Sequence, residues 1–250
     1  MEDLEFALIQ FQKLLIYNVN DMFNNHISKR GVIFLAGGKG LRFSSKTLKQ
    51  FIPFKGKPLA LHAFDVFLKN PCIEEIVVVC QEKYQKIFPK DKRIIFALPG
   101  NLRQDSVISG FKKLSPLINW IYTHDSVRPF INQNMLTQLY KEGKEFGAAS
   151  FASPIHYTIK KISSQKLVIE TLERSNLYIT HTPQLLSRQI FEVGIKKIIK
   201  ENLIITDDVS LAEIIHHPVK IIPDLNTNIK ITLPNDLKLA EALYDQYEQI

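Results

Sequence analysis

The chain has 250 residues, of which 45% are hydrophobic and 23% charged, a balance typical of an ordinary globular protein and not of a disordered, fibrous or disulfide-stapled one. Its length allows one large domain or two small ones. The formal net charge of +7 is compatible with several kinds of anionic partner. Because lysines and arginines are scattered and no nucleic-acid-binding signature is legible, we expect no nucleic-acid partner.

Cysteine usage and hydropathy indicate where the protein works. Only Cys72 and Cys80 are present, without a C-x-x-C pair or a histidine pair at ligand spacing, so neither a zinc site nor a disulfide framework is indicated. No run approaches the ~18 consecutive apolar residues of a membrane span, and the chain opens Met1-Glu2-Asp3 where a signal peptide carries basic residues. We therefore expect a cytoplasmic protein with no membrane partner.

The first half of the chain alternates between strand and helix patterns. Residues 1–29 are predicted to form a helical extension, because apolar residues recur every three to four positions between Leu4 and Phe23. Continuous apolar runs, typical of strands buried on both faces, follow at 31–36, 76–80, 94–97 and 120–123, with helical patterns such as 58–68 and 106–114 between them. This alternation predicts an α/β fold: a mostly parallel sheet with helices on both faces.

The pattern changes after residue 154. Two β-rich segments, 157–162 and 166–170, are joined by the polar turn Ser163-Ser164-Gln165, which predicts a hairpin. We interpret residues 155–182 as a protruding β-arm and not as a second domain. Further expected elements are helices at about 187–201 and 206–216, a strand near 219–222 and a closing helix from Pro234.

A glycine-rich turn follows the first predicted strand. The segment Gly37–Arg42 contains three glycines and two cations, and glycines let backbone N–H groups approach a polyphosphate without interference from Cβ atoms. Its register fits neither a P-loop nor the dinucleotide motif G-x-G-x-x-G, since Phe43 stands at the third glycine position. Arg42 and Lys49 are placed to reach phosphate oxygens over this turn. A plain strand-to-helix turn with surface cations is the alternative.

A second polar cluster follows the strand predicted at 120–123. Asp125 and Arg128 are expected at the carboxyl end of that strand, the edge where ligands bind in open α/β sheets. A carboxylate there suits Mg²⁺, which prefers one or two carboxylates together with phosphate oxygens. The alternative is that Asp125 caps the next helix and pairs with Arg128.

Two further segments have polar residues in unusual places. Residues 100–106 precede a helix and could present backbone and hydroxyl groups to a nucleotide base, although an ordinary helix N-cap has the same pattern. Lys230 lies in the apolar run 228–232, which we interpret as a strand. An ammonium group there is costly unless it meets an anion or lies at an exposed edge.

Taken in order, these motifs resemble the 2-C-methyl-D-erythritol 4-phosphate cytidylyltransferase family, from Gly31 to about Leu243. The motifs that carry the resemblance are Leu35–Arg42, Lys49-Gln50-Phe51, Arg103–Val107, His124–Phe130, Thr182-Pro183-Gln184, Thr206-Asp207-Asp208 and Asn228–Thr232. The resemblance implies a Rossmann-like nucleotidyltransferase domain over residues 30–250. It also implies a homodimer in which the β-arm embraces the partner.

The resemblance further implies transfer of CMP from CTP to 2-C-methyl-D-erythritol 4-phosphate, with release of pyrophosphate and with Mg²⁺ as cofactor. It implies that Arg42 and Lys49 are catalytic and stabilise the transition state. The residues that it places near CTP are Ala36, Gly37, Gly38, Gly100, Asn101, Arg103 and Ser106. Those that it places on the sugar-alcohol phosphate are Asp125, which would also hold the metal, Arg128, Thr158, Lys230 and Arg174, the last reaching into the neighbouring subunit's site.

Two alternative functions stay open. Ribitol-5-phosphate cytidylyltransferases share the fold, the glycine turn and a His-Asp-Ser-Val-Arg-Pro stretch, although Arg103–Val107 and Thr206-Asp207-Asp208 favour the methylerythritol branch. The other alternative is a nucleotide-binding regulatory protein without turnover, against which the presence of Arg42, Lys49 and Asp125 argues.

Overall fold

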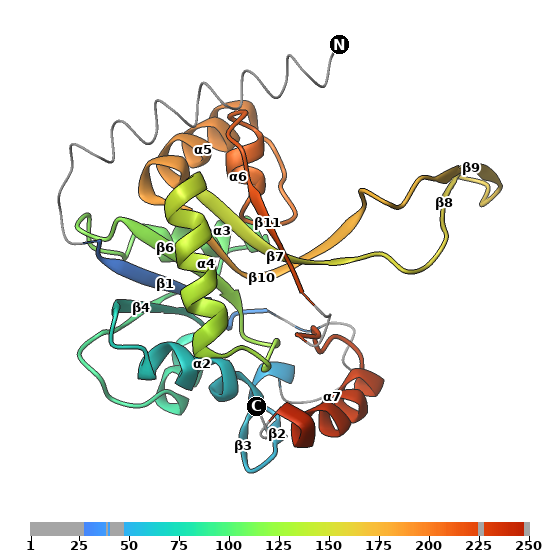
Figure 1. The fold of residues 1–250 in the computed structure, drawn as a ribbon. Helices are drawn as coiled ribbons and strands as arrows, with labels where there is room; N and C mark the ends of the chain where they lie inside the picture. Colours follow the sequence, from blue (N-terminus) through green and yellow to red (C-terminus); the bar gives the residue numbers. More distant parts are fainter. Residues whose placement is uncertain (1–27, 39, 41–47, 225–227, 248–250) are drawn as a thin grey trace.

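A computed structural model describes residues 28–38, 40, 48–224 and 228–247, the side chains of 245–247 excepted. The helix expected between Leu4 and Phe23 lies outside these residues, as does Arg42. The described part has a central sheet between two layers of helices, and a narrow arm projects from one side of it (Figure 1).

The central sheet has seven strands in the order β11-β7-β10-β6-β1-β4-β5. They are β1 (Arg30–Leu35), β4 (Ile73–Val79), β5 (Ile94–Ala97), β6 (Trp120–Asp125), β7 (Ala148–Pro154), β10 (Tyr178–Ser187) and β11 (Lys220–Pro223). Strands β5, β4, β1 and β6 form one parallel set and β11 is parallel to β7, whereas β10 is antiparallel to both of its neighbours. The predicted mostly parallel sheet is confirmed.

Helices cover both faces of this sheet, because successive strand residues point to opposite sides. Val32 and Phe34 pack with α2, the 3-10 helix η2 and α4 on the face turned toward the viewer in Figure 1, and Ile33 packs with α3, α5 and α6 on the other. The helices are α2 (Leu59–Lys69), α3 (Arg103–Phe111), α4 (Gln133–Phe146), α5 (Arg188–Glu201), α6 (Ser210–Glu213), α7 (Pro234–Tyr247), η1 (Lys49–Phe51) and η2 (Glu82–Ile87). Burial of β1 on both sides explains its continuous apolar run.

A smaller apolar cluster brings the end of the chain to the carboxyl edge of the sheet. It joins Val127 and Phe130, from the loop after β6, to Ile231 and to Ala240 of α7. The backbone N–H of Ile231 also donates to the Val127 carbonyl at 3.0 Å. Next to this cluster lies the short ribbon of β2 (Pro53–Phe54) and β3 (Lys57–Pro58). Lys230 is thereby carried to the end of β6.

The arm is the hairpin β8 (Ile159–Ile162) and β9 (Val168–Leu172), which pair antiparallel. It leaves the sheet between β7 and β10 and extends away from the body (Figure 1). The hairpin predicted from the sequence is therefore confirmed.

Three expected elements differ from the structure. Helix α3 begins at Arg103, and within the expected helix 206–216 only α6 is helical. The interpretation of residues 228–232 as a strand is wrong, since they form an irregular segment. Of its apolar residues, Ile231 is buried and Ile229 is partly buried against the cluster around α7, so their spacing reflects that packing and not pairing in a sheet.

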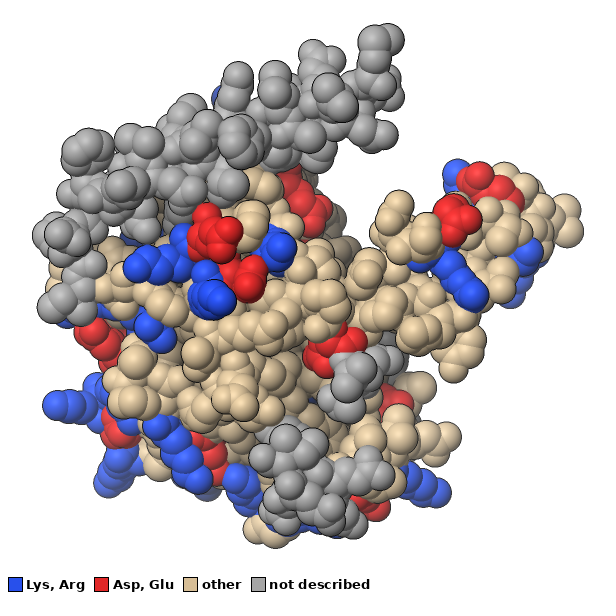
Figure 2. Space-filling model, viewed as in Figure 1, with Lys and Arg blue, Asp and Glu red and all other residues tan. Residues whose placement is uncertain are grey.

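One face of the molecule carries charges of both signs. On the face seen in Figure 2, lysines and arginines are interspersed with acidic residues over the body and the arm. A nucleic-acid track would instead require a continuous field of positive charge. In the described part of the chain, every helix is too short or too polar to cross a membrane.

Two buried histidines link the stability of the fold to pH. His124 is fully buried beside Phe34 and Phe67, and burial lowers its pKa from 6.5 to about 3. His181 is also buried, and burial together with the charge of Arg128 lowers its pKa to about 4. Both imidazoles are therefore neutral in the folded protein near neutral pH.

We predict that the protein loses stability as the pH falls from about 7 to about 5. Since both folded-state pKa values lie below 6.5, the unfolded chain binds more protons below that pH, and the stability contributed by each neutral histidine is progressively lost. The loss should be about 2 kcal/mol per histidine at about pH 5. Urea unfolding measures it. His181→Gln should remove about half of the change, and an unaltered free energy of unfolding in the wild type would contradict the prediction.

Candidate active site

A buried carboxylate at the end of β6 lies at the centre of the candidate site. The Oδ1 atom of Asp125 accepts a hydrogen bond from Arg103 Nε at 3.2 Å, and Oδ2 accepts one from Lys230 Nζ at 2.7 Å. The backbone N–H of Asp125 donates to Thr182 Oγ1 at 2.9 Å. Three of the predicted site residues, separated by 22 and 105 positions in the sequence, are thus in direct contact.

The two cations decide the ionisation state of Asp125. Burial by itself raises the pKa of a carboxyl group, but the charges of Arg103 and Lys230 outweigh it and hold the pKa of Asp125 well below its usual range. For Arg103, burial lowers the pKa, and the carboxylates of Asp208 and Asp125 more than offset that and raise it above its ordinary value. Asp125 and Arg103 are therefore both charged at neutral pH.

A second carboxylate fixes the guanidinium of Arg103. Its Nη1 and Nη2 atoms donate to Oδ1 and Oδ2 of Asp208 at 2.9 and 2.7 Å. A bidentate pair of this kind fixes the plane of the guanidinium as well as its position. Arg103 is therefore held between Asp208 and Asp125 in one orientation.

The glycine turn after β1 is held by the side chain of Gln50. This buried amide donates from Nε2 to the carbonyl oxygens of Ala36 and Gly38 at 2.7 and 2.9 Å. The N–H of Ala36 donates to Val79 O of β4 at 2.9 Å, so the turn starts directly at the edge of the sheet. The described start of the turn, from Ala36 to Gly38, is therefore held both by the sheet and by Gln50.

The first two glycines of this turn differ in their surroundings. A Cβ atom on Gly37 would lie 2.4 Å from Pro99 Cβ, whereas a Cβ on Gly38 would meet nothing within 4 Å. Gly37 is therefore required by close packing against the loop after β5. Gly38 borders open space that a ligand can enter.

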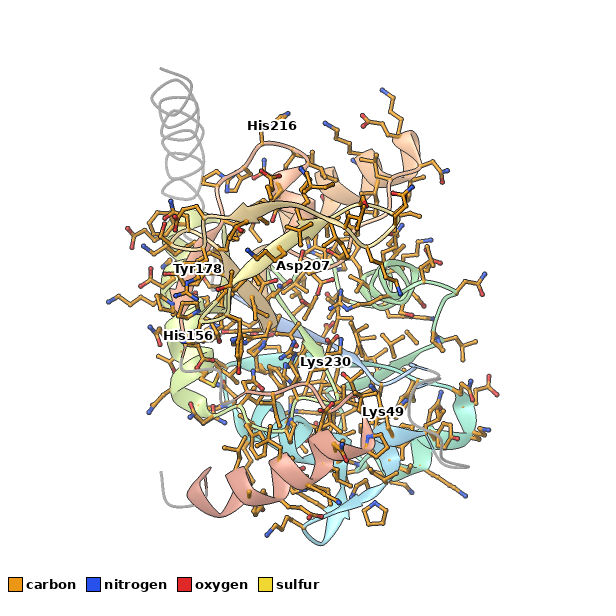
Figure 3. All side chains as sticks on the ribbon, turned by 90° about the vertical axis from the view of Figure 1, so that its right-hand side faces the viewer. Lys49, His156, Tyr178, Asp207, His216 and Lys230 are labelled. Atoms are coloured by element: carbon orange, nitrogen blue, oxygen red, sulfur yellow. The ribbon has the colours of Figure 1, made fainter. Side chains whose placement is uncertain are left out.

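Lys49 lies against the third glycine. A Cβ atom on Gly40, where φ is +59°, would be 3.5 Å from Lys49 Cγ and 3.7 Å from its Cδ. The aliphatic part of Lys49 thus runs along the turn, and the residue begins the same 3-10 helix that carries Gln50. Figure 3 shows Lys49 and Lys230 above helix α7. Arg42, the other predicted catalytic cation, lies outside the described residues.

The predicted base-binding loop closes on its own helix. The N–H of Gly100 donates to Ser106 Oγ at 3.1 Å, and a Cβ on Gly100 would lie 2.2 Å from Asp105 Cβ. Asn101 is exposed between them. The N-cap of α3 is Leu102, whose side chain makes no capping hydrogen bond, and its N–H donates to Asp105 Oδ2 at 2.9 Å. These contacts neither require nor prevent a nucleotide there.

Arg128 takes a different partner from the one considered in the alternative interpretation. Its Nη1 atom donates to the Asn228 carbonyl at 2.8 Å, and Asn132, not Asp125, caps the next helix. That alternative for Asp125 is therefore wrong, because Arg103 and Lys230 are its ion-pair partners. Arg128 instead ties the loop after β6 to the segment that carries Lys230.

The two predicted arm residues do not join this cluster within one chain. Thr158 and Arg174 are exposed, and Arg174 Nη1 donates to the carbonyl of His156, also on the arm. The arm extends away from the body (Figure 1). Their expected action requires the site of a neighbouring subunit.

The described residues contain no cluster of three or more His, Cys, Asp or Glu side chains that could hold a metal ion. The metal ligand predicted from the sequence is Asp125. A single carboxylate fits Mg²⁺ when phosphate oxygens and water complete the coordination. Each oxygen of Asp125 accepts one hydrogen bond from a cation, and each has a second lone pair with which it could coordinate a metal ion.

Sequence reasoning gave no role to several buried polar residues that shape the site. These are Gln50, Thr182, Gln184, Asp208 and Asn228. All stand within the motifs quoted for the family resemblance. Thr182 and Gln184 flank Pro183, which was a local signal for these two residues only. The partners of all five come from distant parts of the chain and could not be paired from spacing.

The model of the family 2-C-methyl-D-erythritol 4-phosphate cytidylyltransferase (IspD) matches residues 31–246. The chain belongs to this family. It is 40% identical over 215 residues to the 2-C-methyl-D-erythritol 4-phosphate cytidylyltransferase of Chlamydia pneumoniae, which covers 86% of this chain and 99% of that relative.

Solved structures agree with the assignment to the IspD family. The 4-diphosphocytidyl-2C-methyl-D-erythritol synthase of Anaerococcus prevotii has a TM-score of 0.77 at 26% identity, over 88% of this chain and 96% of its own. The 2-C-methyl-D-erythritol 4-phosphate cytidylyltransferase of Francisella tularensis also has a TM-score of 0.77 at 26% identity, over 86% of this chain and 100% of its own. As an IspD family member the chain is a nucleotidyltransferase, and the ribitol-5-phosphate alternative is not favoured.

A matched pair of variants tests the different surroundings of the two glycines. Gly37→Ala should destabilise the protein by about 1–3 kcal/mol, because its methyl group must displace Pro99. Gly38→Ala should change stability by less than about 0.5 kcal/mol but should weaken CTP binding, because its methyl group enters the open space. Chemical denaturation and calorimetric titration with CTP measure the two effects. Equal loss of stability in both variants would show that the turn is merely tight.

Proposed function

We propose that this chain transfers the CMP part of CTP to 2-C-methyl-D-erythritol 4-phosphate at the carboxyl edge of the sheet, giving 4-diphosphocytidyl-2-C-methyl-D-erythritol and pyrophosphate. The observation that carries the proposal is the convergence of Arg103 and Lys230 on the buried Asp125 in a chain of the IspD family. The reaction serves the synthesis of isoprenoid precursors outside the mevalonate route.

CTP would bind between the glycine turn and the loop before α3. The open space at Gly38 gives phosphate oxygens access to the backbone, and Arg103 offers a guanidinium held in one orientation. The full set that we assign to CTP is Ala36, Gly37, Gly38, Gly100, Asn101, Arg103 and Ser106.

The chemistry needs charge and alignment more than a protein nucleophile. A phosphate monoester with a second pKa of ~6 is mostly dianionic at neutral pH, so an oxygen of the acceptor phosphate attacks the α-phosphorus of CTP and pyrophosphate leaves. Two anions must approach each other, and fixed cations lower that barrier. We assign this role to Lys49 and Arg42. Mg²⁺, which Asp125 would help to hold, would supply positive charge to the triphosphate.

Lys49→Ala should fold normally and lose most of its turnover. Removing one group that stabilises the transition state commonly lowers the rate by about 10²–10³-fold. Pyrophosphate release from CTP in the presence of the acceptor measures the loss, and Lys90→Ala, at an exposed lysine beyond η2, is the control that should keep full turnover. Near-normal turnover of Lys49→Ala would remove this residue from the catalytic assignment.

The acceptor phosphate would be bound by two sets of residues. Asp125, Arg128 and Lys230 lie together at the end of β6. Thr158 and Arg174 would come from the arm of a second subunit, in a homodimer. Exposed apolar side chains on the arm, among them Leu167 and Val168, support this arrangement, since such a patch is typical of a surface that a partner covers.

Arg174→Ala should mainly raise the KM for the sugar-alcohol phosphate, by about tenfold, because it removes a charged hydrogen-bond donor from a ground-state anion. The kcat should change little. Steady-state kinetics with varied acceptor give both constants, and Lys161→Ala on the same arm is the control for charge. An unaltered KM for the acceptor would rule out the role of Arg174.

The proposed substrate is tested by comparing acceptors. Pyrophosphate release is measured with CTP and either 2-C-methyl-D-erythritol 4-phosphate or ribitol 5-phosphate. We expect rapid release with the first and little with the second, and the reverse preference would refute the assignment.

A cytoplasmic location stays part of the proposal, supported by two cysteines that form no disulfide.

A further inference from the structure

Two motifs without a role in the proposed reaction, 182–184 and 206–208, meet in the fold. Gln184 of β10 is fully buried, and its Oε1 atom accepts a hydrogen bond from the N–H of Asp208 at 2.8 Å. Its Nε2 atom donates to Asp207 Oδ2 at 3.0 Å. The turn that carries Asp208 is therefore fastened to β10 by Gln184, together with Thr180, whose Oγ1 donates to Asp207 Oδ2 at 3.1 Å.

Both carboxylate oxygens of Asp208 contact the same residue. The side chain is 1% exposed, and both of its oxygens accept hydrogen bonds from Arg103, at 2.9 and 2.7 Å. A carboxylate buried to this degree is strongly unfavourable without a cation. Because Arg103 Nε donates to Asp125 at the same time, the position of Asp208 determines the direction from which Arg103 meets Asp125.

The charges of the four ionised side chains that contact one another here cancel. Asp208 and Asp125 are negative, and Arg103 and Lys230 are positive. A group without net charge attracts a distant triphosphate only weakly, so its contribution is geometric. The side chain of Arg103 is 27% exposed and has more N–H donors than these carboxylates use, which leaves donors for a ligand oxygen.

We infer that Asp208 and Gln184 are positioning residues of the cytidylyl-transfer site. Gln184 fixes Asp208, and Asp208 fixes the guanidinium of Arg103 in the orientation that receives CTP. Neither residue touches the reacting atoms. The inference rests on the proposed function, in which Arg103 contacts CTP.

A neighbouring residue, Gln104, provides a control that distinguishes a positioning role from a role in stability alone. Gln104 donates from Nε2 to Leu203 O at 3.0 Å and accepts from Ile205 N at 2.8 Å. It therefore links the start of α3 to the segment before Asp208, as Arg103 links α3 to Asp208 itself. Its side chain makes no hydrogen bond to Asp125 in the described part of the chain, so Gln104→Leu is a matched control.

Asp208→Asn tests the inference through the sign of its effect. If Asp208 positions Arg103, the KM for CTP should rise by about tenfold or more while kcat changes by less than about threefold. If Asp208 only adds negative charge near the triphosphate, its removal should lower the KM for CTP. A lowered or unchanged KM would overturn the inference.

The controls identify the path of the effect. Gln104→Leu should lower the unfolding temperature and leave both kinetic constants within about twofold; a variant of Asp208 that behaves in this way has a structural role only. In a double-mutant cycle, Asp208→Asn should add little to the KM defect of Arg103→Gln, because it acts through Arg103. Additive effects would overturn the inference.

If Asp208→Asn does not fold, Gln184→Leu decides the question. It removes the hydrogen bonds to Asp207 and Asp208 and leaves Arg103 in place, so the KM for CTP should again rise by about tenfold, and an unchanged KM would overturn the inference. The wild type in the same assay reports on the proposed function separately. A wild type that releases no pyrophosphate from CTP and acceptor refutes that function before any variant is compared.

Discussion

A buried carboxylate stays ionised only if cations surround it, and this constraint organises the site. Asp125 is almost completely buried at the end of β6 and accepts hydrogen bonds from Arg103 and Lys230. Without these cations the buried charge would be unpaired, which is strongly unfavourable. The requirement draws helix α3 and the segment before α7 to the same edge of the sheet, where Asp125 lies opposite Leu35, the last residue of β1.

The glycine turn depends on a second constraint, the pairing of buried backbone groups. Gln50 accounts for two carbonyl oxygens of the turn and stands next to Lys49, so the residue that fixes the loop also brings the candidate catalytic lysine to it. Gly37 packs closely against the loop after β5, whereas Gly38 borders open space that a ligand can enter. The residue that supports the turn, Gln50, and the residue proposed to act in catalysis, Lys49, are therefore adjacent in the sequence.

The parts of this arrangement that follow from local patterns were predictable from the sequence. Apolar runs buried on both faces predicted the parallel strands, and the position of Asp125 after such a run predicted the edge at which it lies. The partners of Asp125 were not predictable, since Lys230 is 105 positions away and its segment was misread as a strand. Nor could spacing show that Asp208 faces Arg103, because that contact depends on how the turn after α5 packs on β10. The roles of Thr158 and Arg174 depend on a second subunit and stay predictions.

The proposed function requires that CTP bind at this edge, with its triphosphate over the glycine turn and beside Arg103. The most direct test is a crystal structure of the protein grown with CTP and magnesium. We expect electron density for the phosphates within hydrogen-bonding distance of the backbone at Gly38, with Arg103 still paired to Asp208. Phosphates bound elsewhere, or a nucleotide that leaves the space at Gly38 empty, would contradict the account.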